Sequence, residues 1–188
     1  MDVKPVDELD FFDTYQVKCR DTAVFPEAHK LTYPALGLVN ETAEMLEKYL
    51  DTKAVNDESV IDEVGDVFWY MAAVADIADI KLSEVFRELK TDTWNEIDSF
   101  MFTCGSIAGI IKKAVRDKNG EVSKDKLLFQ LRKLAVLMTW VCSNLIPANA
   151  SESESANGIS VEAVMDRNIS KLADRKKRGV IKGSGDKR

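Results

Sequence analysis

Apolar side chains recur at every third or fourth position along most of the chain, which is the spacing of one buried face of an α-helix. A first helix is predicted over 8–24, and a second begins at Tyr33-Pro34, because proline is tolerated in a first helical turn. Later helices are predicted at about 59–78, from Ser83, before Asn119-Gly120, from Ser123, and over 160–178. No segment alternates as a half-buried strand does. The pattern therefore predicts an all-α fold, a helical bundle.

Three segments refine this prediction. The helix after Pro34 is predicted to bury one apolar stripe, formed by Leu36, Val39, Ala43, Leu46 and Leu50. Residues 67–75 (VFWYMAAVA) carry no charge, and a helix that is apolar all round is a buried one. Residues 149–158 (NASESESANG) are small and polar, which predicts a mobile loop.

The second half of the chain repeats the pattern of the first. Residues 37–50 align with 102–115 at an offset of 65, and residues 60–74 align with 127–141 at an offset of 67. Two stacked copies bury faces that neither copy buries alone, so we interpret the pattern as tandem pseudo-repeats. The predicted units are one domain over 1–188, repeat one at about 9–90, repeat two at about 95–178, and a flexible tail at 179–188.

Composition narrows the class of protein. A chain of 188 residues with 45% hydrophobic side chains is long enough for one domain with a sizeable core. No apolar run of about 20 residues occurs, so we expect no membrane span. The acidic opening segment lacks the features of a secretory signal, and we expect a cytoplasmic protein. Cys19, Cys104 and Cys142 form no Cys-x-x-Cys motif and are expected to be reduced and mostly buried.

Four carboxylates lie on two consecutive predicted helices. Glu41 and Glu44 are three residues apart and share a helix face, and Glu63 and Asp66 repeat that spacing beside the apolar segment. Four carboxylates gathered at a core edge are unfavourable unless cations neutralise them. With a single histidine in the chain, the ligands are all oxygen, which suits Mg²⁺ or Mn²⁺. The first pair alone also fits a solvent-exposed face paired with Lys48.

The end of the chain is basic, although the net charge of the whole chain is -6. Residues 166–188 contain nine Lys and Arg and three acids, so this segment has a net charge of +6. The remaining residues of the chain therefore have a net charge of -12. This negative charge on most of the chain argues against nucleic-acid binding. Lys171 and Arg175 are four residues apart on one helix face and suit an extended polyphosphate, and Arg178 adds a further candidate phosphate contact. A solubilising basic surface is the alternative interpretation.

These motifs resemble those of a known protein family. The sequence ETAE (41–44), an interval of 18 residues and then EVGD (63–66) resemble the signature of the MazG-like, all-α nucleoside triphosphate pyrophosphohydrolases. The flanking segments YPALGL and DVFWYMA, and the basic end of the chain, are similar as well. The resemblance implies a homo-oligomeric enzyme, a dimer or tetramer. Such an enzyme hydrolyses a nucleoside triphosphate, here expected to be a dNTP, to the monophosphate and pyrophosphate with Mg²⁺.

The resemblance also implies roles for individual residues. It implies metal ligation by Glu41, Glu44, Glu63 and Asp66, with Glu41 or Glu44 as the catalytic base. Lys171 and Arg175 resemble the basic pair with which the family holds phosphate oxygens.

Recognition of the base is less specified. Asn168 lies where family members often carry a polar residue, and it is a candidate contact to the base. Trp69 is a candidate stacking surface, although aromatic residues at helical spacing are more often part of a core.

The second pseudo-repeat lacks the acidic signature. The four acids align with Ser106, Gly109, Gln130 and Lys133, from which no divalent-metal site can be built. We therefore predict one acidic site per chain, with acids from repeat one and cations from repeat two, combined within a chain or across a dimer. This arrangement resembles that of the dimeric dUTPases of the same superfamily. The alternative function is a catalytically weak helical module for oligomerisation or regulation that keeps the fold and a bound cation.

Overall fold

The computed structural model describes residues 10–51, 58–89, 98–145 and 158–181, and the regular structure among these residues is entirely helical. The elements are α1 (Phe11–Thr22), the short 3-10 helix η2 (Glu27–His29), α2 (Thr32–Asp51), α3 (Glu58–Asp76), α4 (Leu82–Phe86), α5 (Asp98–Asp117), α6 (Lys124–Asn144) and α8 (Val161–Lys177). The predicted all-α fold is confirmed.

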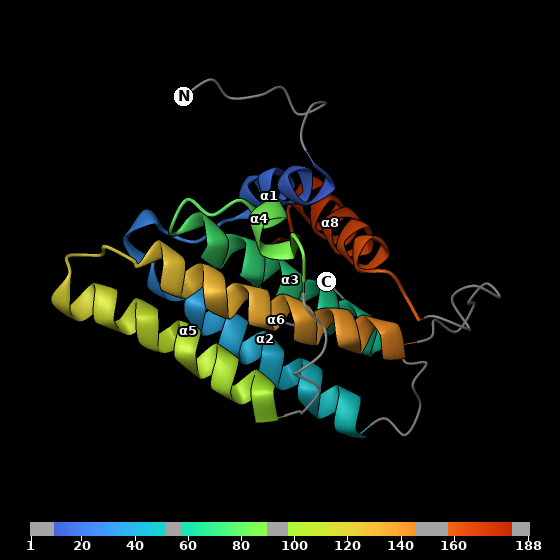
Figure 1. The fold of residues 1–188 in the computed structure, drawn as a ribbon. Coiled ribbons are helices and arrows are strands. Elements are labelled where there is room, and N and C mark those ends of the chain that lie inside the picture. Colours follow the sequence, from blue (N-terminus) through green and yellow to red (C-terminus); the bar gives the residue numbers. More distant parts are fainter. Residues whose placement is uncertain (1–9, 52–57, 90–97, 146–157, 182–188) are drawn as a thin grey trace.

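Two helical hairpins form the body of the molecule. The α2–α3 hairpin packs on the α5–α6 hairpin through contacts of α2 with α5 and of α3 with α6. In Figure 1, α2 and α5 form the lower layer, α3 and α6 lie above them, and α1, α4 and α8 cover the top. This layering leaves α3 and α6 between other helices and explains why the uncharged segment of α3 is buried.

The helices that cover the top, α1, α4 and α8, connect the two hairpins through their packing. Helix α8 follows the second hairpin in the chain but packs on α3 of the first, whereas α4 follows the first hairpin and packs on α6 of the second. Helix α1 contacts α3, α4 and α8. The α2–α3 hairpin is therefore brought against a helix that lies about a hundred residues further along the chain.

The apolar stripe of α2 does not lie where the sequence pattern predicted. Leu36 is 70% exposed and Leu50 is 61% exposed, and Val39 and Ala43 are exposed as well. The core instead receives a neighbouring strip of α2 that contains Leu38 and Met45, both with no exposed surface. Two apolar strips lie side by side on this helix, and periodicity alone does not say which of them faces the core.

Three helix ends lie within one or two residues of the predicted ones, and α4 begins at Leu82, one residue before the predicted Ser83. Ser160 accepts a hydrogen bond from the backbone N–H of Ala163 at 3.1 Å and caps α8. The turn between α5 and α6 uses Asn119 and Gly120, both with positive φ, and Ser123 is the N-cap of α6.

Other predictions concern the loop, the tail, the cysteines and the membrane. The loop at 149–158 lies outside the described residues except for Gly158, as does the tail beyond 181. The three cysteines are buried, free thiols, as predicted. Among the described helices, none is long and apolar enough to cross a membrane.

Candidate metal and phosphate site

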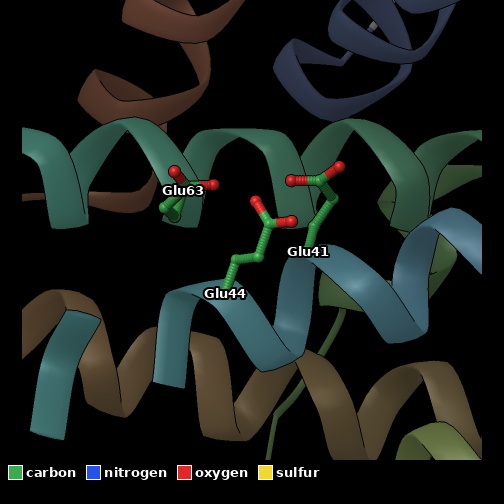
Figure 2. A group of neighbouring side chains, drawn as sticks. All are labelled: Glu41, Glu44 and Glu63. Atoms are coloured by element: carbon green, nitrogen blue, oxygen red, sulfur yellow. The ribbon is translucent and has the colours of Figure 1, made fainter. Parts of the chain in front are cut away.

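Three of the four predicted carboxylates form a cluster between α2 and α3. Each of Glu41, Glu44 and Glu63 offers an oxygen that lies within 4.8 Å of the others. Figure 2 shows Glu41 and Glu44 rising from α2 toward Glu63 on α3, so that the carboxylates meet in the space between the two helices. Glu63 is only 3% exposed, and burying an ionised carboxylate is costly without a partner cation.

A lysine of the same hairpin partly neutralises this cluster. Lys48 lies one helical turn after Glu44 on α2, and its ammonium forms an ion pair with the carboxylate of Glu63. The amide of Asn40 donates a hydrogen bond of 2.8 Å to Glu44. The alternative interpretation of the sequence paired Lys48 with Glu41 and Glu44 on a solvated face, whereas the structure pairs it with the buried Glu63 of the next helix.

Asp66 lies outside the three-residue cluster and is held by α8. Its carboxylate accepts a hydrogen bond of 2.7 Å from the amide of Asn168 and forms an ion pair with Lys171 at 3.0 Å. Helix α8 approaches closely here because residue 65 is glycine, and a Cβ atom at that position would lie 2.9 Å from Cβ of Asn168. In this arrangement Asp66 lies between the acidic cluster and the basic residues of α8.

Asn168 does not point toward a site where a base would bind. It is 2% exposed, and its amide oxygen accepts a hydrogen bond of 3.0 Å from the hydroxyl of Tyr15 while its amide nitrogen donates to Asp66. Both polar atoms of this side chain therefore have partners within the protein. The structure thus shows Asn168 as a buried hydrogen-bond partner of Asp66 and Tyr15, and its contact to a base stays a prediction.

The pKa values of the acids reflect burial and mutual repulsion. Burial, followed by the charges of Asp66, Glu44 and Glu63, raises the pKa of Glu41 to about 7. Burial also raises the pKa of Asp66, although the adjacent ammonium of Lys171 opposes this shift. The site in the absence of a cation thus disfavours full ionisation, and a bound divalent cation would favour it.

A cavity of about 350 Å³ opens beside these acids. Glu41, Asp66 and Arg175 line one part of it. Arg175 is 7% exposed and is brought here by α8. The other part of the cavity is aromatic and is lined by Phe25, Tyr33, Trp69 and Tyr70. Charged and aromatic side chains are therefore adjacent in one cavity.

The aromatic wall depends on two close contacts that sequence reasoning did not single out. Trp69 is 7% exposed, and its indole N–H donates a hydrogen bond of 2.8 Å to the hydroxyl of Thr22. A Cβ atom at Gly37 would lie 2.0 Å from the ring of Tyr70, so only glycine lets this ring lie against α2. A glycine inside a helix lowers helix stability by about 1 kcal/mol relative to alanine. A glycine inside a predicted helix is therefore the sequence signal for a close contact of this kind.

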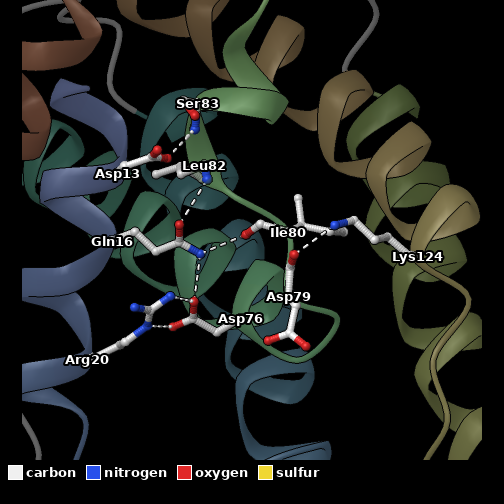
Figure 3. A network of polar contacts seen from close by, with 9 residues as sticks. All are labelled: Asp13, Gln16, Arg20, Asp76, Asp79, Ile80, Leu82, Ser83 and Lys124. Atoms are coloured by element: carbon white, nitrogen blue, oxygen red, sulfur yellow. Dashed lines mark hydrogen bonds and ion pairs between the residues drawn. The ribbon is translucent and has the colours of Figure 1, made fainter. Parts of the chain in front are cut away.

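Helix α1, which carries Thr22, is fixed by a polar network that Figure 3 shows. The amide of Gln16 donates to Asp76 at 2.6 Å and to the carbonyl of Ile80 at 2.9 Å, and its oxygen accepts from the N–H of Leu82 at 2.9 Å. Arg20 forms an ion pair with Asp76 at 2.5 Å. These contacts tie α1 to the turn between α3 and α4 and so hold one wall of the cavity in place.

Two further arginines of the basic end lie away from the cavity. Arg178 is exposed and forms an ion pair with Asp174 of its own helix at 2.7 Å. Arg167 binds Asp62 and Glu58 at 3.0 Å and thereby attaches α8 to α3. Of the predicted phosphate contacts, the structure brings Lys171 and Arg175 to the acids and leaves Arg178 at the surface.

Comparisons with known proteins agree with this geometry. The family model of the MazG nucleotide pyrophosphohydrolase domain matches residues 30–91, which include α2, α3 and all four acids. "Gene 37 protein" of Mycobacterium phage L5 is 36% identical over 87 residues, which cover 39% of this chain and 76% of that relative. No solved structure matches. The chain therefore belongs to the MazG-like nucleotide pyrophosphohydrolase family.

Proposed function

We propose that this protein hydrolyses a nucleoside triphosphate, with deoxynucleoside triphosphates as the first candidates, to the monophosphate and pyrophosphate in the control of nucleotide pools. The observation that carries the proposal is the buried Glu63, clustered with Glu41 and Glu44 beside a cavity that also holds Arg175. A buried group of acids next to a basic, aromatic-lined cavity suits a polyphosphate with a base. Membership of the MazG-like family supports the class of reaction.

The residues present fit a hard divalent cation. All three clustered ligands are carboxylates, and Glu63 is too buried to be solvated as a free ion. Mg²⁺ is the expected cation, with Mn²⁺ as a substitute, and when bound it would supply charge neutralisation for the phosphates. Glu41, Glu44 and Glu63 would hold the cation. Asp66, the fourth predicted ligand, would bind it after its ion pair with Lys171 breaks, or would stay beside the cation without binding it directly.

Residues of the chain would bind the phosphates, accept the proton of water and contact the base. Arg175 and Lys171 would bind phosphate oxygens, since guanidinium and ammonium groups form charge-assisted hydrogen bonds with them. Glu41 would accept the proton of the attacking water, because its carboxylate lines the cavity together with Arg175. Water would add to a phosphorus atom, the anhydride bond between the α and β phosphates would break, and pyrophosphate would leave. Trp69 and its aromatic neighbours would contact the base.

The division of the site between helices supports the predicted duplication. The acids belong to the α2–α3 hairpin of repeat one, whereas Lys171 and Arg175 belong to α8, at the end of repeat two. The crossed packing of α4 and α8 onto the opposite hairpins is what a pseudo-twofold relation between two repeats would produce. We propose on these grounds that each chain forms one complete site from both repeats.

We further propose that the protein is a homo-oligomer. Large apolar side chains are exposed on the two helices of the lower layer: Leu36, Val39 and Leu50 on α2, and Met101 and Phe102 on α5. Exposed charges on the same helices also have opposite signs, with Glu47 on α2 and Lys112 on α5. A second copy rotated so that its α2 lies on α5 would cover the apolar residues and pair these charges.

A substrate panel tests the proposed activity. Pyrophosphate release is measured over the common ribonucleotides and deoxyribonucleotides with Mg²⁺, with EDTA as the metal-free control. We expect turnover with Mg²⁺ that falls at least about a hundredfold in Glu41→Gln, because the loss of a base and a metal ligand combines two contributions. Equal rates for the wild type and Glu41→Gln, or no pyrophosphate release from any nucleotide, would instead favour a helical regulatory module.

A further inference from the structure

A second cavity, of about 320 Å³, lies between α5 and α6 of the other hairpin. Its lining includes Ser106, Gly109, Lys113, Lys126, Phe129 and Gln130. None of these residues belongs to the acid cluster or to the aromatic cavity described above. The cavity is therefore separate from the site to which the proposed function refers.

The position of this cavity corresponds to that of the acid cluster. In the alignment of the two halves, Ser106, Gly109 and Gln130 occupy the places of Glu41, Glu44 and Glu63. At the same offset of 65, Lys113 occupies the place of Lys48. The lysine is thus retained in the second half, whereas each of the three carboxylates is replaced by a neutral residue.

The two hairpins also have net charges of opposite sign. Residues 32–76, which contain the first hairpin, carry ten acids and two lysines, a net charge of -8. Residues 98–144, which contain the second hairpin, carry eight Lys and Arg and four acids, a net charge of +4. Within the described part of the chain, neither Lys113 nor Lys126 has an ion-pair partner, since the nearby Asp117 binds Arg116 at 2.5 Å. Two ammonium groups therefore line a cavity that has no carboxylate in its lining.

Neutral polar groups and an aromatic ring complete the lining. The hydroxyl of Ser106 and the amide of Gln130 are hydrogen-bond donors of the kind that accompany cations in oxyanion sites. Phe129 is 58% exposed, and the ammonium of Lys133 lies 4.8 Å from the centre of its ring. A third cation thus stands at the edge of the cavity, next to an exposed aromatic surface.

We propose that this cavity binds a small phosphate-bearing anion directly, without a divalent metal. Lys113 and Lys126 would supply the charge, and Ser106 and Gln130 would donate hydrogen bonds to phosphate oxygens. A nucleotide and inorganic pyrophosphate share this chemistry, and a nucleotide would in addition contact Phe129. The inference goes beyond the proposed function and does not depend on it, since binding here needs neither turnover nor the acid cluster.

Metal-free calorimetry with the full chain tests the proposal. Inorganic pyrophosphate and AMP are titrated separately in EDTA, where the acid cluster repels anions. We expect binding to weaken at least about tenfold in the double variant Lys113→Ala/Lys126→Ala, as the loss of two charge-assisted contacts predicts. Ser106→Glu restores an acid at the cavity and should weaken binding to a similar extent. Tighter binding of AMP than of pyrophosphate would identify a nucleotide as the better ligand.

Two control variants locate the binding. Lys118→Ala and Lys18→Ala each remove an exposed lysine that does not line the cavity, and both should bind as the wild type does. Circular dichroism confirms that each variant is folded. No metal-free binding, equal weakening in either control, or binding that the double variant retains and Lys171→Ala loses would overturn the proposal.

Discussion

At the scale of single residues, Glu63 bears the largest conflict between burial and charge in the site. Its carboxylate is almost fully buried, and both Lys48 and a divalent cation are suitable partners for it. Neutralising this residue tests whether the buried charge serves metal binding. Glu63→Gln keeps the size of the side chain and removes the charge.

We expect Glu63→Gln to reduce Mg²⁺-dependent turnover at least about a hundredfold, because one ligand of the cation is lost. The thermal stability of the metal-free protein should change little, since the repulsion that the variant relieves offsets the lost ion pair with Lys48. Differential scanning calorimetry with and without Mg²⁺ measures both effects. A variant that Mg²⁺ still stabilises as strongly as the wild type would show that Glu63 is no ligand.

The raised pKa of Glu41 predicts how metal binding depends on pH. Without metal, the folded protein holds this proton up to about pH 7, whereas an unfolded chain releases it near the ordinary value of glutamic acid. The contribution of Glu41 to the stability of the metal-free protein is therefore lost as the pH rises toward 7. Because Mg²⁺ competes with the proton, its affinity should rise by about tenfold per pH unit below 7 and level off above it.

Calorimetric titrations of Mg²⁺ between pH 5.5 and 8.5 measure this dependence. Glu41→Gln removes the titrating group and serves as the control, with a weaker affinity that changes less with pH. An affinity of the wild type that is constant over this range would show that Glu41 carries no proton linked to metal binding.

The sequence predicted the convergence of three of the four acids but not the contacts around them. Glu41 and Glu44 share a helix face by spacing alone, and their proximity to Glu63 follows once two consecutive helices form a hairpin. Periodicity contains no information about the ion pair between Lys48 and Glu63 or about the ring of Tyr70 against Gly37. Such contacts depend on how the two helices are rotated about their axes.

At the scale of elements, the docking of α8 on α3 joins the basic side of the site to its acidic side. The contact rests on Gly65, which lies against Asn168, and on the bonds of Asp66 to Asn168 and Lys171. The sequence predicted α8 as a helix and Lys171 as a phosphate contact. It could not predict that the partner of Lys171 is Asp66, because the two residues are 105 positions apart.

Gly65→Ala should displace α8 from α3. We expect a loss of about 1–3 kcal/mol in the free energy of unfolding, since the added methyl group overpacks a buried contact. Turnover should fall as well, because Lys171 moves away from the acids. Urea unfolding and pyrophosphate release measure the two effects.

Gly105→Ala is the matched control, because a Cβ atom at that helical position meets no atom within 4 Å. This substitution should raise the free energy of unfolding by about 0.5–1 kcal/mol through helix propensity and leave turnover unchanged. Equal stability of Gly65→Ala and Gly105→Ala would contradict the close contact of α8 at Gly65.

At the scale of the whole molecule, the exposed apolar surface of α2 and α5 predicts self-association. The sequence reasoning expected the stripe with Leu36 to be inside the chain, and the structure places it outside. Both observations are consistent if a second copy covers the stripe. The interior strip with Leu38 lies in the core, and the proposed second copy would cover the outer strip.

Leu36→Lys should convert the proposed oligomer to monomers without unfolding the chain, because this side chain contributes little to the core of a single copy. Light scattering coupled to size-exclusion chromatography gives the mass of each form. Glu121→Gln makes the same change in net charge at an exposed turn and should leave the mass unchanged. A wild type that is monomeric at micromolar concentration would exclude this interface.

The crossed packing of α8 has a consequence for biosynthesis. The acids at 41–66 leave the ribosome well before Lys171 and Arg175, so a growing chain has its carboxylates long before the cations proposed to bind phosphate. Under the proposed function, a nascent chain would hydrolyse no nucleotide until α8 has been synthesised. A chain that terminates before α8 would accordingly be inactive.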